Sequence, residues 1–169
     1  MISILESYAA KKRNLCAGAA DGIRSQFEPG YLCALLRREY SKAAEQKGVL
    51  MDIDLEPGIV YRGVEAELRQ MICVLIENAV KYCDSGGNIT LQLRKGRRPI
   101  LSVTNTYCTV SMLELDSLFD RFYRADKART AGSGFGIGLS IAKAVAENHN
   151  ADIYAENIND AAIRFVVKL

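Results

Sequence analysis

Apolar residues recur along this chain at two spacings, and each spacing predicts a different element. Between residues 65 and 83 they fall at i, i+3, i+4 and i+7, the pattern of a long amphipathic helix. Gly48 is a natural stop for an earlier helix that begins after a Glu-Pro-Gly turn. The helices expected from this spacing cover residues 2–25, 31–47, 65–83 and 136–149.

The second spacing alternates apolar and polar residues and predicts strands that come in adjacent pairs. The expected strands cover residues 51–55, 59–61, 88–94, 100–105, 152–157 and 162–169. Short turns join them into three hairpins, the first of them around residues 56–58. Strand pairs separated by helices favour an α+β fold, a two-layer sandwich with a mixed, mostly antiparallel sheet and helices on one face.

Composition limits the class of protein. A length of 169 residues suits one domain with a short appendage, and 49% hydrophobic with 25% charged residues is ordinary for a globular chain. Five scattered cysteines without a C-x-x-C pair indicate reduced thiols rather than disulfides or a zinc site. No apolar run approaches the ~20 residues of a membrane span, so we expect a cytoplasmic chain or cytoplasmic piece.

The single histidine, His149, lies near the expected end of a helix and has no ligand-type neighbour at helical spacing. We interpret it as a capping or packing residue. A basic turn at residues 94–99 is either a solvated hairpin turn or a docking patch.

A glycine-rich stretch, "GSGFGIGL" at 132–139, leads directly into an apolar helical run. Glycine costs conformational entropy, so bare backbone must be needed there, either for tight packing or for amides that cradle a phosphate at a helix N-terminus. The spacing is G-x-G-x-G-x-G, and no strand leads into it, which argues against a Rossmann fingerprint.

The helix at 65–83 carries a second candidate site. Asn78 borders the buried stripe, where an amide must be hydrogen-bonded by protein or ligand, and Lys81 and Tyr82 follow on the same face. An amide oxygen, a cation and an aromatic ring suit a magnesium ion, a phosphate and a sugar or base. The alternative is a structural asparagine with a solvated lysine and a core tyrosine, and Glu77 and Lys81 can equally be a surface ion pair.

Three segments together, "IENAVKY", "LFDRFYRADKAR" and "GFGIGLSIAKAVAENH", resemble the catalytic and ATP-binding domain of bacterial sensor histidine kinases. The resemblance covers about residues 31–169 and implies the Bergerat ATP-binding fold. ATP would lie between the asparagine helix and a lid, here residues 121–133. Phe119, Phe122 and Tyr123 are expected to anchor that lid to the core.

The resemblance implies roles for individual residues. Asn78 would be the Mg²⁺ ligand, and the residues implied in catalysis are Asn78, Glu77 and Lys81. The residues implied in binding ATP are Asn78, Lys81, Tyr82, Asn105, Arg124, Gly134, Gly136, Ile137, Gly138 and Leu139.

The chain departs from the family pattern in its first glycine box. Asn105 stands where the family has the aspartate that accepts a hydrogen bond from the adenine amino group. Tyr107 and Thr109 stand at the glycine positions, and Asn150 and Ala151 replace a later glycine pair. An asparagine amide can accept from adenine, or flip and donate to the O6 of guanine.

We therefore expect an Mg-ATP-binding catalytic domain at residues 29–169, preceded at 1–28 by a helical segment that could be the tail of a dimerisation hairpin. It would transfer the γ-phosphoryl of ATP to a histidine on a separate dimerisation domain. A response regulator would be an indirect partner, nucleic acid and direct membrane contact are not expected, and the parent protein would be membrane-anchored. The alternatives are a non-catalytic nucleotide-binding module, or pseudokinase, and an anti-sigma-type serine kinase.

Overall fold

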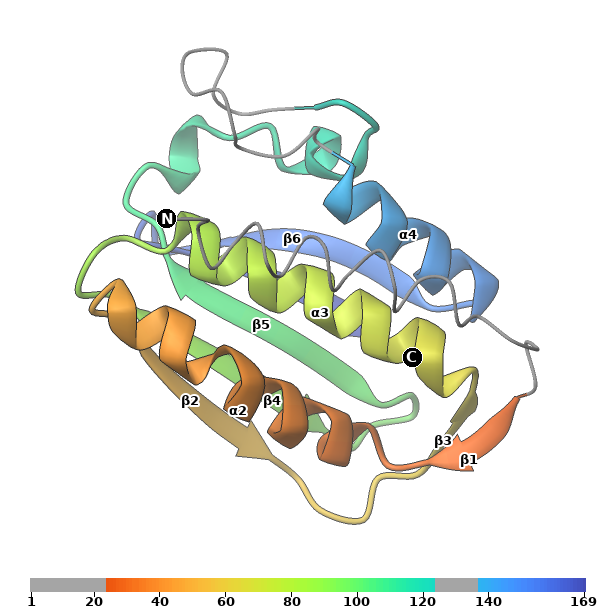
Figure 1. Ribbon diagram of the computed structural model, residues 1–169. Coiled ribbons are helices and arrows are strands. Elements are labelled where there is room, and N and C mark those ends of the chain that lie inside the picture. The colour runs from red at the N-terminus through yellow and green to blue at the C-terminus, as the bar shows by residue number, and fades with distance from the viewer. Residues whose placement is uncertain (1–23, 124–136) are drawn as a thin grey trace, which may run out of the picture.

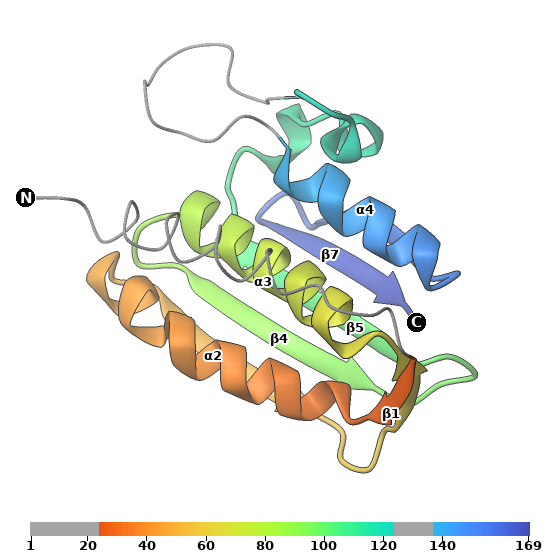
Figure 2. The same cartoon turned by 45° about the vertical axis from the view of Figure 1, so that its right-hand side comes forward.

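A computed structural model describes residues 24–123 and 137–169 of the chain. Helices α2, α3 and α4 cover one face of a five-stranded sheet, as both views show (Figures 1 and 2). The strand order is β2-β4-β5-β7-β6, with β2 parallel to β4 and every other pair antiparallel. The expected α+β two-layer sandwich with a mixed, mostly antiparallel sheet is confirmed.

The helices agree closely with the apolar spacing. Their bounds are Pro29–Gln46 for α2, Glu65–Tyr82 for α3 and Gly138–Asn148 for α4. Gly48 follows α2 with a left-handed φ of 68°, a conformation that glycine adopts without strain. Two short 3₁₀ turns, η1 at Val110–Met112 and η2 at Leu115–Phe119, lie between β5 and the part of the chain that leads to α4.

The sheet strands also lie where the alternation predicts. Their bounds are Leu50–Leu55 for β2, Asn88–Arg94 for β4, Ile100–Thr106 for β5, Asp152–Ile158 for β6 and Ala162–Lys168 for β7. The β4–β5 and β6–β7 hairpins are confirmed. The last strand turns Ile163, Phe165 and Val167 into the core, as its alternation requires.

The first expected hairpin is wrong. β2 pairs in parallel with β4, while β3, Tyr61–Gly63, pairs with β1, Ser25–Phe27, in a separate two-stranded sheet. The register gives the reason, because it sets the apolar positions Met51, Ile53 and Leu55 beside those of β4. The three residues of β3 offer no comparable apolar face. Ser25 is thus a strand residue, and the rest of the helix expected at 2–25 lies outside the described residues, apart from Arg24.

A continuous core fills the space between the sheet and the helices. Three helices and two strands contribute buried apolar side chains to it. They are Leu32 and Leu36 from α2, Leu68, Met71, Ile72, Leu75 and Ile76 from α3, Ile89, Leu91 and Leu93 from β4, Leu101 and Val103 from β5, and Ala142 and Ala146 from α4. All six apolar positions of the sequence stripe on α3 are buried, which fixes the rotation of that helix. Residues beside the stripe, Asn78 among them, therefore lie at its border.

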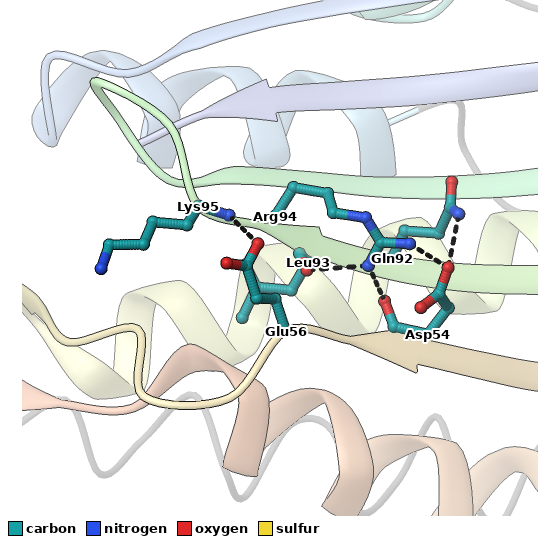
Figure 3. Close-up of polar contacts among 6 residues, drawn as sticks. All are labelled: Asp54, Glu56, Gln92, Leu93, Arg94 and Lys95. Atoms are coloured by element: carbon teal, nitrogen blue, oxygen red, sulfur yellow. Dashed lines mark hydrogen bonds and ion pairs between the residues drawn. The ribbon is translucent and has the colours of Figure 1, made fainter.

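The opposite face of the sheet carries polar side chains that bond to one another (Figure 3). Asp54 accepts from Arg94 and from Gln92, and the Lys95 amide donates to the Glu56 carboxylate over 2.7 Å. Arg98, further along the basic turn, binds the backbone carbonyl of Leu169 and the Asp152 carboxylate. Arg94 and Arg98, two cations of the turn at 94–99, therefore bond to partners within the domain, which favours a structural role for the turn over a docking patch.

Candidate nucleotide-binding site

The C-terminal half of α3 and the start of α4 lie side by side (Figure 2). A Cβ added at Gly138 would lie 3.6 Å from Cγ1 of Val74. Asn78 follows Val74 by one helical turn and so shares its face. The half-buried Asn78 amide is therefore carried beside the N-terminal end of α4, and residues 24–123 and 137–169 give its side chain no hydrogen bond.

The beginning of α4 presents backbone amides. Gly138 is the first helical residue and is exposed, Ile137 before it is 39% exposed, and the half-buried Leu139 packs against the core. The first amides of a helix have no intrahelical acceptor and lie at the positive end of its dipole, which suits an anion such as phosphate. Arg124, Gly134 and Gly136, also expected at this site, lie outside the described residues.

Asn105 lies on β5 and is 1% exposed; the next residue, Thr106, accepts a backbone hydrogen bond from Asp84, just after the C-terminus of α3. Its Nδ2 donates to the Thr106 carbonyl over 3.1 Å, while its Oδ1 is buried without a hydrogen-bond partner in the described part of the chain. A flipped amide would set Oδ1 against the Thr106 oxygen and lose that bond. The amide is thus held with its acceptor free, and an unpaired buried acceptor costs about 1–3 kcal/mol unless a ligand donates to it.

Glu77 is drawn toward α2 rather than α4. Its carboxylate accepts a hydrogen bond from the Tyr40 hydroxyl over 2.8 Å. Burial raises the pKa of Tyr40 above its usual range, and the neighbouring Cys73 and Glu77 raise it further. This contact gives Glu77 a structural role that the sequence did not reveal, because 37 residues separate the two partners.

Lys81 and Tyr82 end α3 on the surface. The Lys81 Nζ lies 4.8 Å from the centre of the Tyr82 ring, which is 42% exposed. Lys47, which sequence reasoning missed, donates to the carbonyls of Val80 and Lys81 at 2.7 Å each and so satisfies the last turn of α3. Lys81 and Tyr82, both expected to contact the nucleotide, are therefore accessible at the end of α3.

The expected anchors of the lid behave differently from one another. Phe119 is buried and meets Phe165 edge to face, with ring centroids 6.1 Å apart. Phe122 has a left-handed φ of 66°, which turns the chain at that residue, and its ring is 72% exposed. Phe119 therefore packs into the core as expected, Phe122 does not, and Tyr123 is half-buried, while most of the expected lid lies outside the described residues.

His149 serves as a cap and as a packing residue, as its position indicated. Its Nε2 accepts from the Val64 amide over 3.0 Å, and its Nδ1 donates to the Val145 carbonyl over 2.8 Å. Tyr61 packs on the ring, and a Cβ at Gly63 would lie 2.8 Å from it. The imidazole thus ties the end of α4 to the start of α3.

Metal binding at this site would depend on few protein ligands. Within the described ranges, no three His, Cys, Asp or Glu side chains are grouped to hold an ion. Mg²⁺ commonly keeps several waters and binds through one or two protein oxygens together with substrate phosphates. The free amide of Asn78 beside the amides of α4 fits that second arrangement.

The fold can be compared with those of known protein families. The model of the histidine kinase-, DNA gyrase B- and HSP90-like ATPase family matches residues 63–169, and the chain belongs to this family. Among the helices at 24–123 and 137–169, none has the length and apolar character needed to cross a bilayer.

Its curated relatives are sensor kinases. The chain is 32% identical over 139 residues to the sensor protein DltS of Streptococcus agalactiae, an alignment that covers 82% of this chain and 35% of that protein. It is 35% identical over 109 residues to the sensor histidine kinase YkoH of Bacillus subtilis, covering 64% of this chain and 24% of that one. The chain spans about a third or less of the length of these relatives.

Solved structures share the fold. Full-length ShkA in complex with AMPPNP aligns with a TM-score of 0.76 at 21% identity, covering 90% of this chain and 32% of ShkA. A nucleotide-free catalytic domain of the histidine kinase ThkA aligns at 0.75 and 16% identity, covering 87% of this chain and 97% of that domain. The expected kinship with sensor histidine kinases is confirmed.

Proposed function

We propose that this chain binds Mg-ATP between the C-terminal half of α3 and the start of α4, as the catalytic domain of a sensor histidine kinase. The observation that carries the proposal is the buried, unpaired Oδ1 of Asn105. It supplies a hydrogen-bond acceptor at a place the fold leaves without a donor. The N6 amino group of adenine is a donor that would satisfy it.

In this proposal the amide oxygen of Asn78 would hold Mg²⁺ together with the phosphates of ATP. The exposed Lys81 and Tyr82 would contact a phosphate and flank the nucleotide. Ile137, Gly138 and Leu139 would present backbone amides to the triphosphate, and Arg124, Gly134 and Gly136 complete the proposed set. A bound Mg²⁺ would neutralise charge on the phosphates.

The proposed reaction is attack by an imidazole nitrogen of the acceptor histidine on the γ-phosphorus, with cleavage of the bond to the β-phosphate oxygen and release of ADP. In this proposal the acceptor would belong to a separate dimerisation domain. The one histidine of this sequence, His149, is buried with both ring nitrogens hydrogen-bonded and is not available as the acceptor. A catalytic part for Glu77 competes with its bond to Tyr40.

Binding is tested by titrating ATP into the chain with and without Mg²⁺. Asn78→Ala should abolish the Mg²⁺-dependent part of binding and leave the fold intact, since α3 keeps its apolar stripe. Asn148→Ala, which removes an exposed amide at the far end of α4, is the matched control and should bind as the parent does. Unchanged Mg²⁺-dependent binding by Asn78→Ala would refute the assignment.

Glu77→Gln in the same titration separates the roles of that residue. A part in transfer predicts normal binding with loss of phosphoryl transfer to an added dimerisation domain. Normal transfer by Glu77→Gln would leave Glu77 a structural partner of Tyr40.

Tight binding by the parent chain without any transfer would favour the alternative of a non-catalytic module, to which the altered first glycine box points.

A further inference from the structure

One residue, Asp84, joins the turn after α3 to the end of β5, at one end of the domain (Figure 1). Its backbone N–H donates to the Thr106 carbonyl over 3.1 Å, and its carboxylate accepts from the Cys108 amide over 2.7 Å. A hydrogen bond has a preferred length and angle. Two of them from one residue therefore fix both the position and the direction of the backbone between Thr106 and Cys108.

The same turn surrounds Thr106. The Thr106 hydroxyl accepts from the Asn88 amide over 3.1 Å, and a Cβ added at Gly87 would lie 2.8 Å from the Thr106 Cβ. The turn is closed by the Gly87 amide, which donates to the Asp84 carbonyl over 3.0 Å. Glycine is thus needed at position 87 because the backbone approaches Thr106 too closely for a side chain.

The Thr106 carbonyl also sets the orientation of the Asn105 side chain. It accepts from Nδ2 of Asn105 over 3.1 Å, and this bond leaves the buried Oδ1 without a partner in the part of the chain that the structure describes. An asparagine amide offers an oxygen as acceptor and an NH₂ group as donor. The direction of the Thr106 carbonyl therefore decides which of the two Asn105 presents to a ligand.

We propose that Asp84 is a positioning residue for recognition of the base. By fixing residues 106–108, it keeps the acceptor of Asn105 directed at the ligand and so favours adenine over guanine, whose O6 requires a donor. This role rests on the proposed function, in which Asn105 accepts from the adenine amino group. Because the Asp84 carboxylate belongs to a side chain, a substitution can remove its bond and leave the backbone bonds of the segment in place, such as that from the Tyr107 amide to the Ala161 carbonyl.

The first test uses the ligand-free chain and measures hydrogen exchange of the Asn105 side-chain amide by ¹H–¹⁵N NMR. Its pair of signals is identified as the pair that Asn105→Asp loses. Asp84→Ala should make this pair exchange about fivefold faster than in the parent, the effect of losing about one neutral hydrogen bond. Asp84→Asn retains an oxygen that can accept from Cys108 and should keep the exchange slow. Asp84 lies in a half-buried turn outside the core, so both variants should keep the dispersed spectrum of the parent.

The second test titrates ATP and GTP, each with Mg²⁺, into the same proteins. Asp84→Ala should weaken ATP about fivefold and tighten GTP, because the released amide can rotate and donate to guanine O6. Asp84→Asn should restore the ratio of the two affinities found in the parent. Ser85→Ala removes an exposed side chain of the same turn and is the matched control, expected to change neither affinity. A merely structural role for Asp84 would lower stability in urea and leave this ratio unchanged.

Two results would overturn the proposal: exchange of the Asn105 amide that stays slow in Asp84→Ala, or a ratio of ATP to GTP affinity that is the same in Asp84→Ala and the parent. ATP binding by the parent together with that unchanged ratio would reject the role of Asp84 alone. A parent chain that does not bind ATP would reject the proposed function and, with it, the part of Asp84 in recognising the base.

Discussion

The two ends of the α3–α4 pair each hold a buried polar side chain, and the two are treated in opposite ways. At one end both nitrogens of His149 are hydrogen-bonded, to Val64 and Val145. At the other end Asn105 has its Nδ2 bonded and its Oδ1 unpaired within the described ranges. Both residues are almost fully buried, so exposure does not explain the difference.

The difference agrees with the proposed function, in which one end of the pair is structural and the other binds the nucleotide. A buried polar group with all its hydrogen bonds formed stabilises the fold, whereas one with an unpaired atom lowers stability until a ligand forms the missing hydrogen bond. The same end as Asn105 carries the free amide of Asn78 and the exposed start of α4. The contrast predicts that substitutions at His149 change stability and that substitutions at Asn105 change affinity.

The largest expected effect is at His149. His149→Ala removes two hydrogen bonds and buried ring contacts and leaves the Val64 amide without its acceptor, so it should lower the free energy of unfolding by about 2–4 kcal/mol. Urea denaturation measures the loss. His149→Phe keeps a ring without the nitrogens and should recover only part of it. An equal loss of nucleotide affinity in the folded variant would break the distinction between the two ends.

A smaller effect is expected at Asn105. Asn105→Asp offers adenine a charge-assisted hydrogen bond in place of a neutral one and should tighten ATP about tenfold, on the order of 1–2 kcal/mol. The carboxylate also faces the Thr106 carbonyl, so the ligand-free variant should unfold at lower urea than the parent. Titrations of the parent and the variant with ATP and with GTP measure the two affinities. GTP should bind weakly to both proteins, because each offers the base a hydrogen-bond acceptor and guanine O6 requires a donor. Weaker ATP binding by Asn105→Asp would place Asn105 away from the base.

The smallest effect is expected far from both ends, at Asp54 on the exposed face of the sheet (Figure 3). Hydrogen bonds from Arg94 and Gln92 lower the pKa of the Asp54 carboxyl. A lowered pKa contributes stability above the unfolded value of about 3.9 and loses it as pH falls through the folded value. Asp54→Asn should therefore unfold slightly earlier than the parent in urea at pH 7, and the gap should close in acid. Asp52→Asn, on the same strand, is the control, and a gap that persists in acid below the folded pKa would contradict the account.

Local patterns predicted most of the elements because their causes are local. The apolar stripe on α3, the alternation in β4, β5, β6 and β7 and the helix stop at Gly48 can each be read from a few neighbouring residues of the sequence. The partner of β2 could not be predicted in this way, since its apolar face fits β4 across an intervening helix. A turn signal at residues 56–58 favoured the nearer strand.

The candidate site likewise has features that the sequence predicted and features that it did not. The positions of Asn78, Asn105 and Gly138 on their elements followed from the pattern and the resemblance. The hydrogen bond from Asn105 to Thr106, the Tyr40 contact to Glu77 and the cap by Lys47 did not, because they depend on backbone geometry or on partners far apart in the chain. The exposure of Phe122 depends on a left-handed φ that an aromatic residue rarely adopts.

The parallel pairing of β2 with β4 has a consequence for the order in which the protein folds. The β4–β5 and β6–β7 hairpins close over short loops, but β2 reaches β4 only after the whole of β3 and α3 has been placed between them. Closing that longer loop costs more chain entropy before any contact forms. We expect the β2 amides to gain protection after those of the β4–β5 hairpin in pulsed hydrogen exchange during refolding, and protection of β2 before β4 and β5 would exclude this order.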